Sequence, residues 1–388
     1  MRGVIERLMG GAHVMILAGE ASGDAHAAEF VEHLKRERPD IQVSGMGGRE
    51  MVRAGVEVFF DSSIIAVVGL VEVIKHWGDI KRAMATVRER LEKTRPDLLV
   101  LVDYPEFNLK MARRARELGI RVLFYISPQV WAWRPKRIHK IGRLIDHMAV
   151  IFKFEQSFYQ QAGIPVSFVG HPLVDKVKPA ADPAVLRERL GIGAEDRVIG
   201  LFPGSRQSEI SRLMPLMLET ARLLQQRDAR TRFLLPVAST LDYRDLERRC
   251  ADSGLDIDLD GDDIYATIPC CDAIVSCSGT VTLEIALLGV PMCIVYRMSP
   301  LSYLIMSRLI KIPHIGLANI VAGKPVAREF LQNEATPENI SAELTALIED
   351  RNYRRQVIAG LAGVRENLGT GDGSQNMAQL VISLIDRS

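Results

Sequence analysis

Short, continuously apolar runs recur along this chain, and each of them ends in a cluster of turn residues. His13–Ala18, Leu98–Val102 and Val198–Phe202 are three such runs, each long enough for a buried strand but short for a helix. Amphipathic helical patterns such as Ile80–Thr94 and Pro215–Arg227 separate the runs. Strands that alternate with helices predict a parallel, doubly wound α/β sheet, because each helix returns the chain to the edge where the previous strand began.

The chain has 388 residues, which is too long for one ordinary hydrophobic core, so we expect two domains. The proline- and alanine-rich stretch Lys176–Pro183 is the expected linker. We place a first domain at 1–178, a second at 179–350 and closing helices at 351–388, for which packing back onto the first domain is one option. Two Rossmann-like domains are expected to enclose a cleft that receives the carboxyl ends of their strands.

The stretch Arg197–Ile210 combines an apolar run, a glycine turn and the start of a helical pattern. Unpaired backbone N–H groups and the helix dipole face such a turn, which favours an anion there. Gly204 and Ser205 form the turn, and Glu209 lies in the first turn of the helix. Arg206 can grip a phosphate through two N–H groups. The alternative is an ordinary strand–turn–helix corner with a surface arginine.

A second corner of the same kind follows the apolar run that ends at Ser276. Glu284 lies one helical turn beyond the corner, where a carboxylate can accept hydrogen bonds from ribose hydroxyls. The alternative is a capped helix in which Glu284 only complements the dipole. Two such corners in one domain favour a nucleoside diphosphate as the ligand. The residues of this second corner are Ser278, Gly279, Thr280, Thr282 and Glu284.

The first domain has a corner of its own at Gly19–Asp24. This corner is suited either to bind a phosphate of a second substrate or to support chemistry through Glu20. This corner lacks the GxGxxG spacing, and the chain has no GxxxxGK[ST] motif, which disfavours a dinucleotide site and a P-loop. Asp103 directly follows the apolar run Leu98–Val102 and is expected to point into the cleft. It is a candidate general base, with a helix cap or turn aspartate as the alternative.

Residues 64–77 read IIAVVGLVEVIKHW and are too apolar for a loop, yet many basic residues follow them. Trp131 and Trp133 stand in a second basic region, residues 110–143. An apolar patch beside a basic, tryptophan-bearing face suits a lipid or a membrane surface. The alternative is a buried helix beside a solvated basic surface. The side chains that we assign to this apolar patch are Val67, Val68, Leu70, Val71 and Ile74.

Composition restricts the remaining classes of function. The net charge of +1 gives no case for nucleic acid, although an excess of basic residues in the first half suggests an anionic surface there. The five cysteines have no metal-type spacing and are expected to be buried thiols in a reducing compartment. The acidic cluster at 256–263 is expected to be a solvated loop rather than a metal site. No apolar run reaches the length of a membrane span, so we expect a cytoplasmic protein with at most peripheral membrane contact.

Two isolated polar residues remain ambiguous at this point. His171, after a predicted strand, is expected to be a structural turn histidine. Asn319 either hydrogen-bonds a ligand or caps a turn.

Several longer stretches together resemble the lipid-A-disaccharide synthase family, in the family's order and over nearly the whole chain. The matching stretches are AGEASGD (Ala18–Asp24), GMGG (Gly45–Gly48), VVGLVEV (Val67–Val73), VDYPEFN (Val102–Asn108), YISPQVWAWRPKR (Tyr125–Arg137), FVGHPLVD (Phe168–Asp175), FPGSRQSEI (Phe202–Ile210), SGTVTLE (Ser278–Glu284) and ANIVAG (Ala318–Gly323). Two alternatives remain: another UDP-N-acetylglucosamine enzyme of the same fold, such as a 2-epimerase, and a non-catalytic lipid-binding protein.

The resemblance implies an inverting GT-B glycosyltransferase that needs no cofactor and no metal. Members of the family transfer 2,3-diacylglucosamine from UDP-2,3-diacylglucosamine to 2,3-diacylglucosamine 1-phosphate (lipid X), which gives UDP and the β(1→6) disaccharide 1-phosphate of lipid A. The step takes place in Gram-negative bacteria at the cytoplasmic face of the inner membrane, whose anionic surface is then an expected partner. The oligomeric state stays open between a monomer and a homodimer.

The resemblance also implies roles for individual residues. Asp103 and Arg206 match positions that the family treats as essential, and Asn319 and Glu20 are similar catalytic candidates. Asp103 would take the proton of the acceptor hydroxyl, with Glu20 as its substitute, and Arg206 would stabilise the departing UDP together with the amides of Gly204 and Ser205. The remaining assignments are phosphate to Ser278–Thr280, ribose to Glu284, further UDP contacts to Glu209 and Thr282, and acyl chains to the apolar patch.

Overall fold

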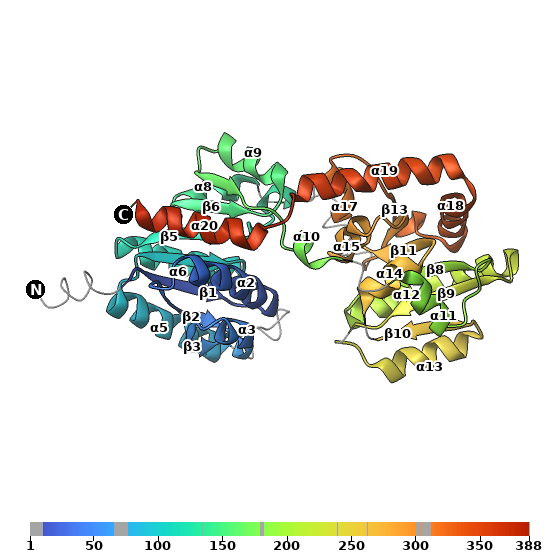
Figure 1. The fold of residues 1–388 in the computed structure, drawn as a ribbon, viewed down its shortest axis with the longest axis horizontal. Coiled ribbons are helices and arrows are strands. Elements are labelled where there is room, and N and C mark those ends of the chain that lie inside the picture. Colours follow the sequence, from blue (N-terminus) through green and yellow to red (C-terminus); the bar gives the residue numbers. More distant parts are fainter. Residues whose placement is uncertain are drawn as a thin grey trace, which may run out of the picture. The chain divides into compact units, whose positions relative to one another are not determined.

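The computed structural model describes residues 11–65, 77–133, 135–178, 182–238, 240–261, 263–299, 303 and 312–387. The chain forms two compact units, each built on one parallel sheet with helices between successive strands (Figure 1). The first unit comprises Met1–Pro172 and Gly369–Ser388, and the second comprises Leu173–Leu368. The predicted α/β architecture of two parallel, doubly wound sheets is confirmed.

The first unit contains a seven-stranded sheet in the order β3-β2-β1-β4-β5-β6-β7. Its central strands are continuously apolar because helices cover both of their faces, as parallel sheets require. The strands are β1 (His13–Ala18), β2 (Gln42–Gly47), β3 (Glu57–Asp61), β4 (Leu98–Val102), β5 (Arg121–Tyr125), β6 (His147–Val150) and β7 (Val166–Phe168). The helices are α2 (Ala21–Glu37), α3 (Arg49–Arg53), η1 (Ser62–Ile64), α5 (Trp77–Thr94), α6 (Pro105–Glu117), α7 (Val130–Trp133), η2 (Pro135–Arg137), α8 (Ile138–Gly142), α9 (Lys153–Gln161) and α20 (Gly373–Asp386).

The second unit contains a six-stranded sheet in the order β10-β9-β8-β11-β12-β13. The strands are β8 (Arg197–Phe202), β9 (Thr231–Pro236), β10 (Ile257–Asp260), β11 (Ala273–Cys277), β12 (Met292–Tyr296) and β13 (Arg328–Leu331). The helices are α10 (Leu173–Lys176), α11 (Pro183–Arg189), α12 (Gln207–Arg227), α13 (Tyr243–Ser253), α14 (Ile264–Cys270), α15 (Val281–Leu287), α17 (Leu317–Ala322), η3 (Gln332–Glu334), α18 (Pro337–Glu349) and α19 (Arg351–Leu368).

Strand β10 corrects one expectation, because the acidic cluster is not simply a solvated loop. Ile257 and Leu259 alternate with Asp258 and Asp260, which is the period-two pattern of a half-buried edge strand. The strand pairs in parallel with β9. The run of aspartates concealed this alternation in the sequence.

The two C-terminal helices belong to different units. Helix α19 packs against α15, α17 and α18 of the second unit. Helix α20 packs against α2 of the first unit, where Arg121 donates to the carbonyl of Leu384 and Asn376 donates to that of Val169. The chain therefore re-enters the first unit at Gly369, and its first crossing lies at Pro172–Leu173, just before the proline-rich stretch.

Strand register brings distant motifs to common sheet edges. In the first unit Ala18 of β1 pairs with Val102 of β4, so that Glu20 and Asp103 leave the sheet at the same edge. In the second unit Phe202 of β8 pairs with Ser276 of β11, which places the two glycine corners side by side. Each unit thus presents polar residues at the carboxyl end of its central strands.

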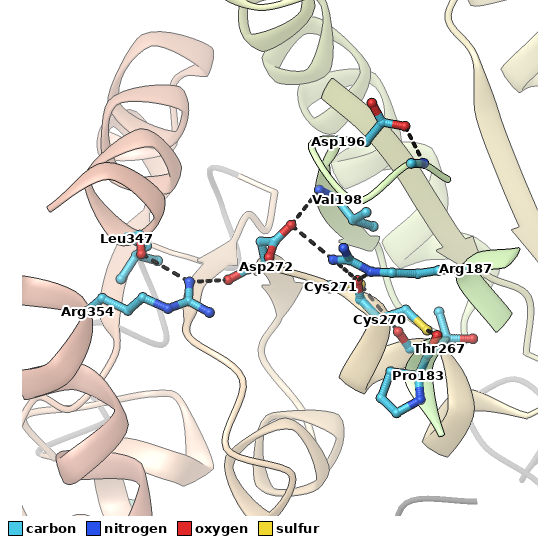
Figure 2. A network of polar contacts seen from close by, with 11 residues as sticks. Pro183, Arg187, Asp196, Val198, Thr267, Cys270, Cys271, Asp272, Leu347 and Arg354 are labelled. Carbon is cyan, nitrogen blue, oxygen red and sulfur yellow. Dashed lines mark hydrogen bonds and ion pairs between the residues drawn. The ribbon is translucent and has the colours of Figure 1, made fainter. Parts of the chain in front are cut away.

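A polar network at the opposite edge of the second sheet fixes the start of its two central strands (Figure 2). One carboxylate oxygen of Asp272 accepts the N–H of Val198 at 2.8 Å and the guanidinium of Arg187 at 3.1 Å, while its carbonyl accepts Arg354 at 2.6 Å. Arg187 also donates to the carbonyl of Cys270. Cysteines contribute packing to this region, and all five in the chain are buried free thiols, as expected.

We predict that Asp272→Ala lowers the free energy of unfolding by about 1–3 kcal/mol, because it leaves the Val198 N–H without its acceptor and removes the carboxylate partner of Arg187. Urea denaturation measures the loss. Asp196→Ala is the matched control, since Asp196 accepts one backbone N–H, from Gly193 at 2.7 Å, at an exposed turn shown in the same view (Figure 2). An equal loss in both variants would contradict an anchoring role for Asp272.

Candidate functional site

The two glycine corners of the second unit line one pocket of about 590 Å³. It lies at the carboxyl ends of β8, β9, β10 and β11, as the strand registers require. Of the nine residues that the sequence assigned to UDP, eight line this pocket. They are Gly204, Ser205, Arg206, Glu209, Ser278, Gly279, Thr280 and Glu284. Residues at and after the ends of β9 and β10 complete the wall, and the sequence pattern assigned none of them to this pocket. They include Pro236, Val237, Ala238, Asp260 and Asp263.

The glycine turn after β8 is held by Glu209. Its carboxylate accepts the backbone N–H groups of Ser205 at 3.0 Å and of Arg206 at 3.2 Å. Gly204 has a φ of 114°, and a Cβ atom there would lie 2.2 Å from Glu209 Oε2. Only glycine fits between the turn and this carboxylate. The expectation that the Ser205 amide faces a diphosphate is corrected, because Glu209 already occupies that donor.

Arg206 stays available at this turn. Its side chain is 72% exposed, and its Nη1 lies 3.7 Å from Glu209 Oε1, beyond hydrogen-bond distance. The guanidinium can therefore turn its N–H groups toward an anion in the pocket.

The second corner separates into residues that line the pocket and one that supports it. Thr282 is fully buried, and its hydroxyl donates to the carbonyl of Gly279 at 2.8 Å. Its predicted contact with UDP is corrected to a capping role within the corner. Ser278 donates to the carbonyl of Ile315 at 2.9 Å, which ties the corner to the loop before α17.

Glu284 lines the pocket and forms a hydrogen bond with Tyr265, a residue that the sequence pattern did not predict for the site. Tyr265 donates its hydroxyl to Glu284 Oε1 at 3.1 Å. Burial raises the pKa of Glu284 above its ordinary value, and this hydrogen bond opposes the rise. Tyr265 lies 19 residues before Glu284, on α14, so no local motif could have connected the two.

The aspartates of the acidic cluster that the structure describes make contacts within the protein. Asp258 and Asp256 pair with Arg232 at 3.0 and 3.5 Å. Asp263 caps α14 by accepting the N–H of Tyr265 at 2.8 Å, and Asp260 accepts the Thr267 hydroxyl. Within the described part of the chain, no group of three histidine, cysteine or acidic side chains is placed to bind a metal ion.

The first unit brings Asp103 and Glu20 together at the edge of β1 and β4. Burial, and after it the negative charge of Glu20, raise the pKa of Asp103 to about 6, while a hydrogen bond from the backbone of Tyr104 and the nearby His26 oppose the rise. Glu20 occupies the N-cap position of α2, but its side chain makes no cap hydrogen bond. A carboxylate with a pKa near neutrality beside a second carboxylate is a suitable general base.

A different carboxylate of the same corner is structural. Asp24 is buried and accepts the N–H groups of Gly48 at 2.6 Å, Glu50 at 3.0 Å and Met51 at 3.2 Å. It joins the corner after β1 to the glycine turn after β2. The two motifs that contain these residues therefore depend on each other.

Asn319 is saturated by contacts within the protein. Its side-chain amide donates to the carbonyl of Ala327 and to Glu329 Oε1, both at 2.7 Å, and its oxygen accepts the N–H groups of Val326 and Ala327. The residue is fully buried. Such a side chain positions the loop that Glu329 also holds through Ile315 and Gly316, and it offers no polar atom to a substrate.

Trp131 and His171 point into the first unit. Trp131 donates to Glu155 at 3.0 Å and packs edge-on against Phe154, and burial raises the pKa of Glu155 to about 8. His171 packs on Phe152 with ring centroids 5.1 Å apart, and burial lowers its pKa to about 3. It is a neutral structural histidine, as expected.

The apolar patch Val67, Val68, Leu70, Val71 and Ile74 lies outside the described residues. The described chain resumes at Trp77, which is 46% exposed and has the ammonium groups of Lys81 and Lys110 within 6 Å of its ring. None of the helices that the structure describes has the length and apolar character to cross a membrane.

A family model and curated relatives both match this chain over nearly its whole length. A family model described as lipid-A-disaccharide synthetase matches residues 14–377. Proteins named lipid-A-disaccharide synthase from Geobacter metallireducens and Coxiella burnetii are 50% and 42% identical to this chain. Each alignment covers 96% of this chain, with 97% and 98% of the respective relative.

Solved structures share the fold at low sequence identity. A UDP-GlcNAc 2-epimerase from Neisseria meningitidis bound to UDP-GlcNAc is 12% identical, with a TM-score of 0.63 over 97% of this chain and all of that chain. A glycosyltransferase from Rickettsia africae is 13% identical, with a TM-score of 0.59 over 97% of this chain and 98% of that chain. The fold class is the two-domain GT-B fold, as predicted.

Proposed function

The chain belongs to the lipid-A-disaccharide synthetase family, and from this premise we propose which of its residues perform the transfer. The enzyme transfers 2,3-diacylglucosamine from UDP-2,3-diacylglucosamine to 2,3-diacylglucosamine 1-phosphate. The products are UDP and the β(1→6) lipid A disaccharide 1-phosphate. The acceptor's primary hydroxyl oxygen forms a bond to the anomeric carbon while the bond from that carbon to the diphosphate oxygen breaks, and UDP leaves with the electron pair.

The UDP group of the donor is assigned to the pocket of the second unit. The observation that carries this assignment is that both glycine corners line the same pocket. Arg206 supplies the positive charge for the diphosphate, and Ser278 and Gly279 contact a phosphate from the neighbouring corner. Glu284 accepts ribose hydroxyls through Oε2, because Tyr265 occupies Oε1. The amino end of α12, a 21-residue helix, adds its dipole.

The proton of the acceptor hydroxyl is assigned to Asp103. Its raised pKa supports this role, because a base whose pKa lies near the working pH is both deprotonated and basic enough to accept a proton. Glu20 contributes by raising the pKa of Asp103, and it is the substitute base if Asp103 is not the acceptor of the proton. Asn319 acts through the loop it positions.

We expect Gly279→Val to weaken UDP binding by about tenfold or more, since overpacking a contact surface costs ~1–3 kcal/mol. A Cβ atom at Gly279 meets no protein atom within 4 Å, so the new side chain enters the pocket without disturbing the fold. Isothermal titration with UDP measures the change. Gly363→Val on α19 is the control. A Cβ atom there also meets open space, and no residue of α19 lines the pocket. Unchanged UDP affinity in Gly279→Val would place the nucleotide elsewhere.

Peripheral attachment to the cytoplasmic face of the inner membrane is a further part of the proposal. The exposed Trp77 flanked by Lys81 and Lys110 supports it, because tryptophan and lysine favour the interface of an anionic bilayer. The adjoining apolar patch is assigned to acyl chains. The oligomeric state stays open between a monomer and a homodimer, and sedimentation velocity of the full chain distinguishes the two.

Replacing Trp77, Lys81 and Lys110 together with alanine is expected to lower binding to anionic phospholipid vesicles by about tenfold or more, since each basic residue contributes ~1 kcal/mol near such a surface. Vesicle co-sedimentation measures the binding, with zwitterionic vesicles for comparison. Tyr243→Ala removes an aromatic side chain of similar exposure from the second unit and serves as the control. Equal binding by the triple variant and the unmodified protein would remove Trp77 from the membrane contact.

A further inference from the structure

The turn that carries Asp103 has an unusual backbone. Asp103 and Tyr104 have φ values of 46° and 44°, so two consecutive residues with full side chains adopt the left-handed conformation that favours glycine. Such strain persists only where surrounding contacts enforce it, and it concentrates at functional sites. One buried side chain supplies several of the contacts that enforce it here.

That side chain is Asn108, in the first helical turns of α6. It is fully buried, and its Nδ2 lies 2.7 Å from the carbonyl oxygen of Asp103 and 3.2 Å from that of Val102. The carbonyl oxygen of Leu17 is also within reach, at 3.4 Å. The amide of Asn108 thus donates to the ends of both strands that lead to Glu20 and Asp103.

The ring of Tyr104 closes the other side of the turn. It lies against Gly19, where a Cβ atom would come within 2.2 Å of Tyr104 Cδ1, and the Tyr104 hydroxyl donates to the carbonyl of Ile65 at 3.2 Å. The turn is therefore held between Asn108 and Gly19. These contacts restrict the direction in which the Asp103 side chain leaves the turn.

The oxygen of Asn108 argues against a purely structural role. It is buried and has no hydrogen-bond partner within the described protein. A buried polar atom without a partner destabilises the fold, so this oxygen offsets part of what the amide gains by donating to the turn.

We propose that Asn108 is a positioning residue for the catalytic base, and that its amide holds the left-handed turn that directs the Asp103 carboxylate toward the acceptor hydroxyl. The inference rests on the proposed role of Asp103. In its absence the turn relaxes, and the carboxylate moves toward solvent. Asn108 itself does not touch the substrate.

The test is Asn108→Leu, which removes the donors and the unpaired oxygen while it keeps the branching of the side chain at Cγ. We expect kcat to fall by about 100-fold, the loss that a base misplaced by an ångström produces, with KM for both substrates within about threefold. We also expect the acid limb of the kcat/KM profile to move to lower pH, because an Asp103 that is more solvated is a stronger acid. The thermal midpoint is expected to fall, because the buried carbonyls of Val102 and Asp103 lose their donor, but the shift of the acid limb does not follow from a loss of folded protein.

Two results would overturn the proposal: an unchanged kcat, or a fall in kcat that matches the loss of folded protein with the acid limb in place. If Asn108→Leu does not fold, Asn108→Ala is measured in the same way, since the pH of the acid limb is independent of the folded fraction. Asn376→Ala, which removes an asparagine donor to the carbonyl of Val169 in the same unit, should leave kcat unchanged. Asp103→Asn, measured in parallel, distinguishes a failure of the proposed base from a failure of the positioning proposal. Full activity in Asp103→Asn refutes Asp103 as the base. Full activity in Asn108→Leu, with Asp103→Asn inactive, refutes only the positioning role of Asn108.

Discussion

Replacing Asp103 with asparagine is expected to lower kcat by about 10²–10⁴-fold, the contribution of a general base. The amide keeps the size of the carboxylate but cannot accept the proton of the attacking hydroxyl. In the unmodified enzyme, kcat/KM should rise with pH through about 6, the pKa to which burial and Glu20 raise Asp103, and then level off. Disaccharide formation from the two acylated sugar substrates measures both effects.

The same substitution is expected to stabilise the fold at neutral pH. Because the pKa of Asp103 is about 6 in the folded state and 3.8 in its ordinary range, the folded state binds the proton more tightly. Unmodified protein therefore loses stability as the pH rises through this window. Asparagine carries no charge, so Asp103→Asn should be more stable by roughly 1–3 kcal/mol at pH 7, with the difference vanishing below about pH 4.

Lost activity with gained stability distinguishes a catalytic carboxylate from a structural one. Asp61→Asn is the control, because Asp61 is an exposed aspartate of the same unit that only caps η1 through the N–H of Ser63. Glu20→Gln identifies the substitute base: if it abolishes turnover while Asp103→Asn retains it, the roles of the two carboxylates are reversed.

The parts of the site that depend on local pattern could be predicted from the sequence. Each glycine corner is formed by consecutive residues. An apolar run, small residues and a helical pattern, in that order, predict a strand, a turn and the start of a helix. The position of Asp103 directly after a strand is equally local. Parallel pairing then brings the corners together, because the carboxyl ends of neighbouring strands share one edge.

The parts that depend on side-chain direction and on distant contacts could not be predicted. The sequence predicts a UDP contact for Thr282 and makes Asn319 a catalytic candidate. Packing instead turns the polar atoms of both side chains inward, where they form hydrogen bonds with the main chain. Tyr265 reaches Glu284 from another helix, and the return of α20 to the first unit joins residues several hundred positions apart. The left-handed turn at Asp103 is also invisible in the sequence, because no glycine marks it.

Arg206→Ala is expected to lower kcat by about 10²–10³-fold, which is the effect of removing one donor that stabilises developing negative charge. Glu209 occupies the amides of Ser205 and Arg206, so the turn itself has few donors left for the diphosphate, and the guanidinium must supply most of the positive charge. Arg206→Lys keeps the charge but loses the planar fork and should recover part of the rate. Arg212→Ala, an exposed arginine on the same helix, is the control.

The affinity for the donor, UDP-2,3-diacylglucosamine, measured without acceptor on the same Arg206→Ala variant, distinguishes two ways in which the arginine can act. If Arg206 mainly binds the ground state, the donor affinity falls as far as kcat/KM, and kcat is preserved at saturating donor. If it mainly stabilises charge as UDP departs, kcat falls while the donor affinity changes little. We expect the second result, because the guanidinium is largely exposed at the pocket wall and its attraction to the diphosphate grows as the leaving oxygen gains charge. A fall in affinity alone would assign the stabilisation of the leaving group to the second corner instead.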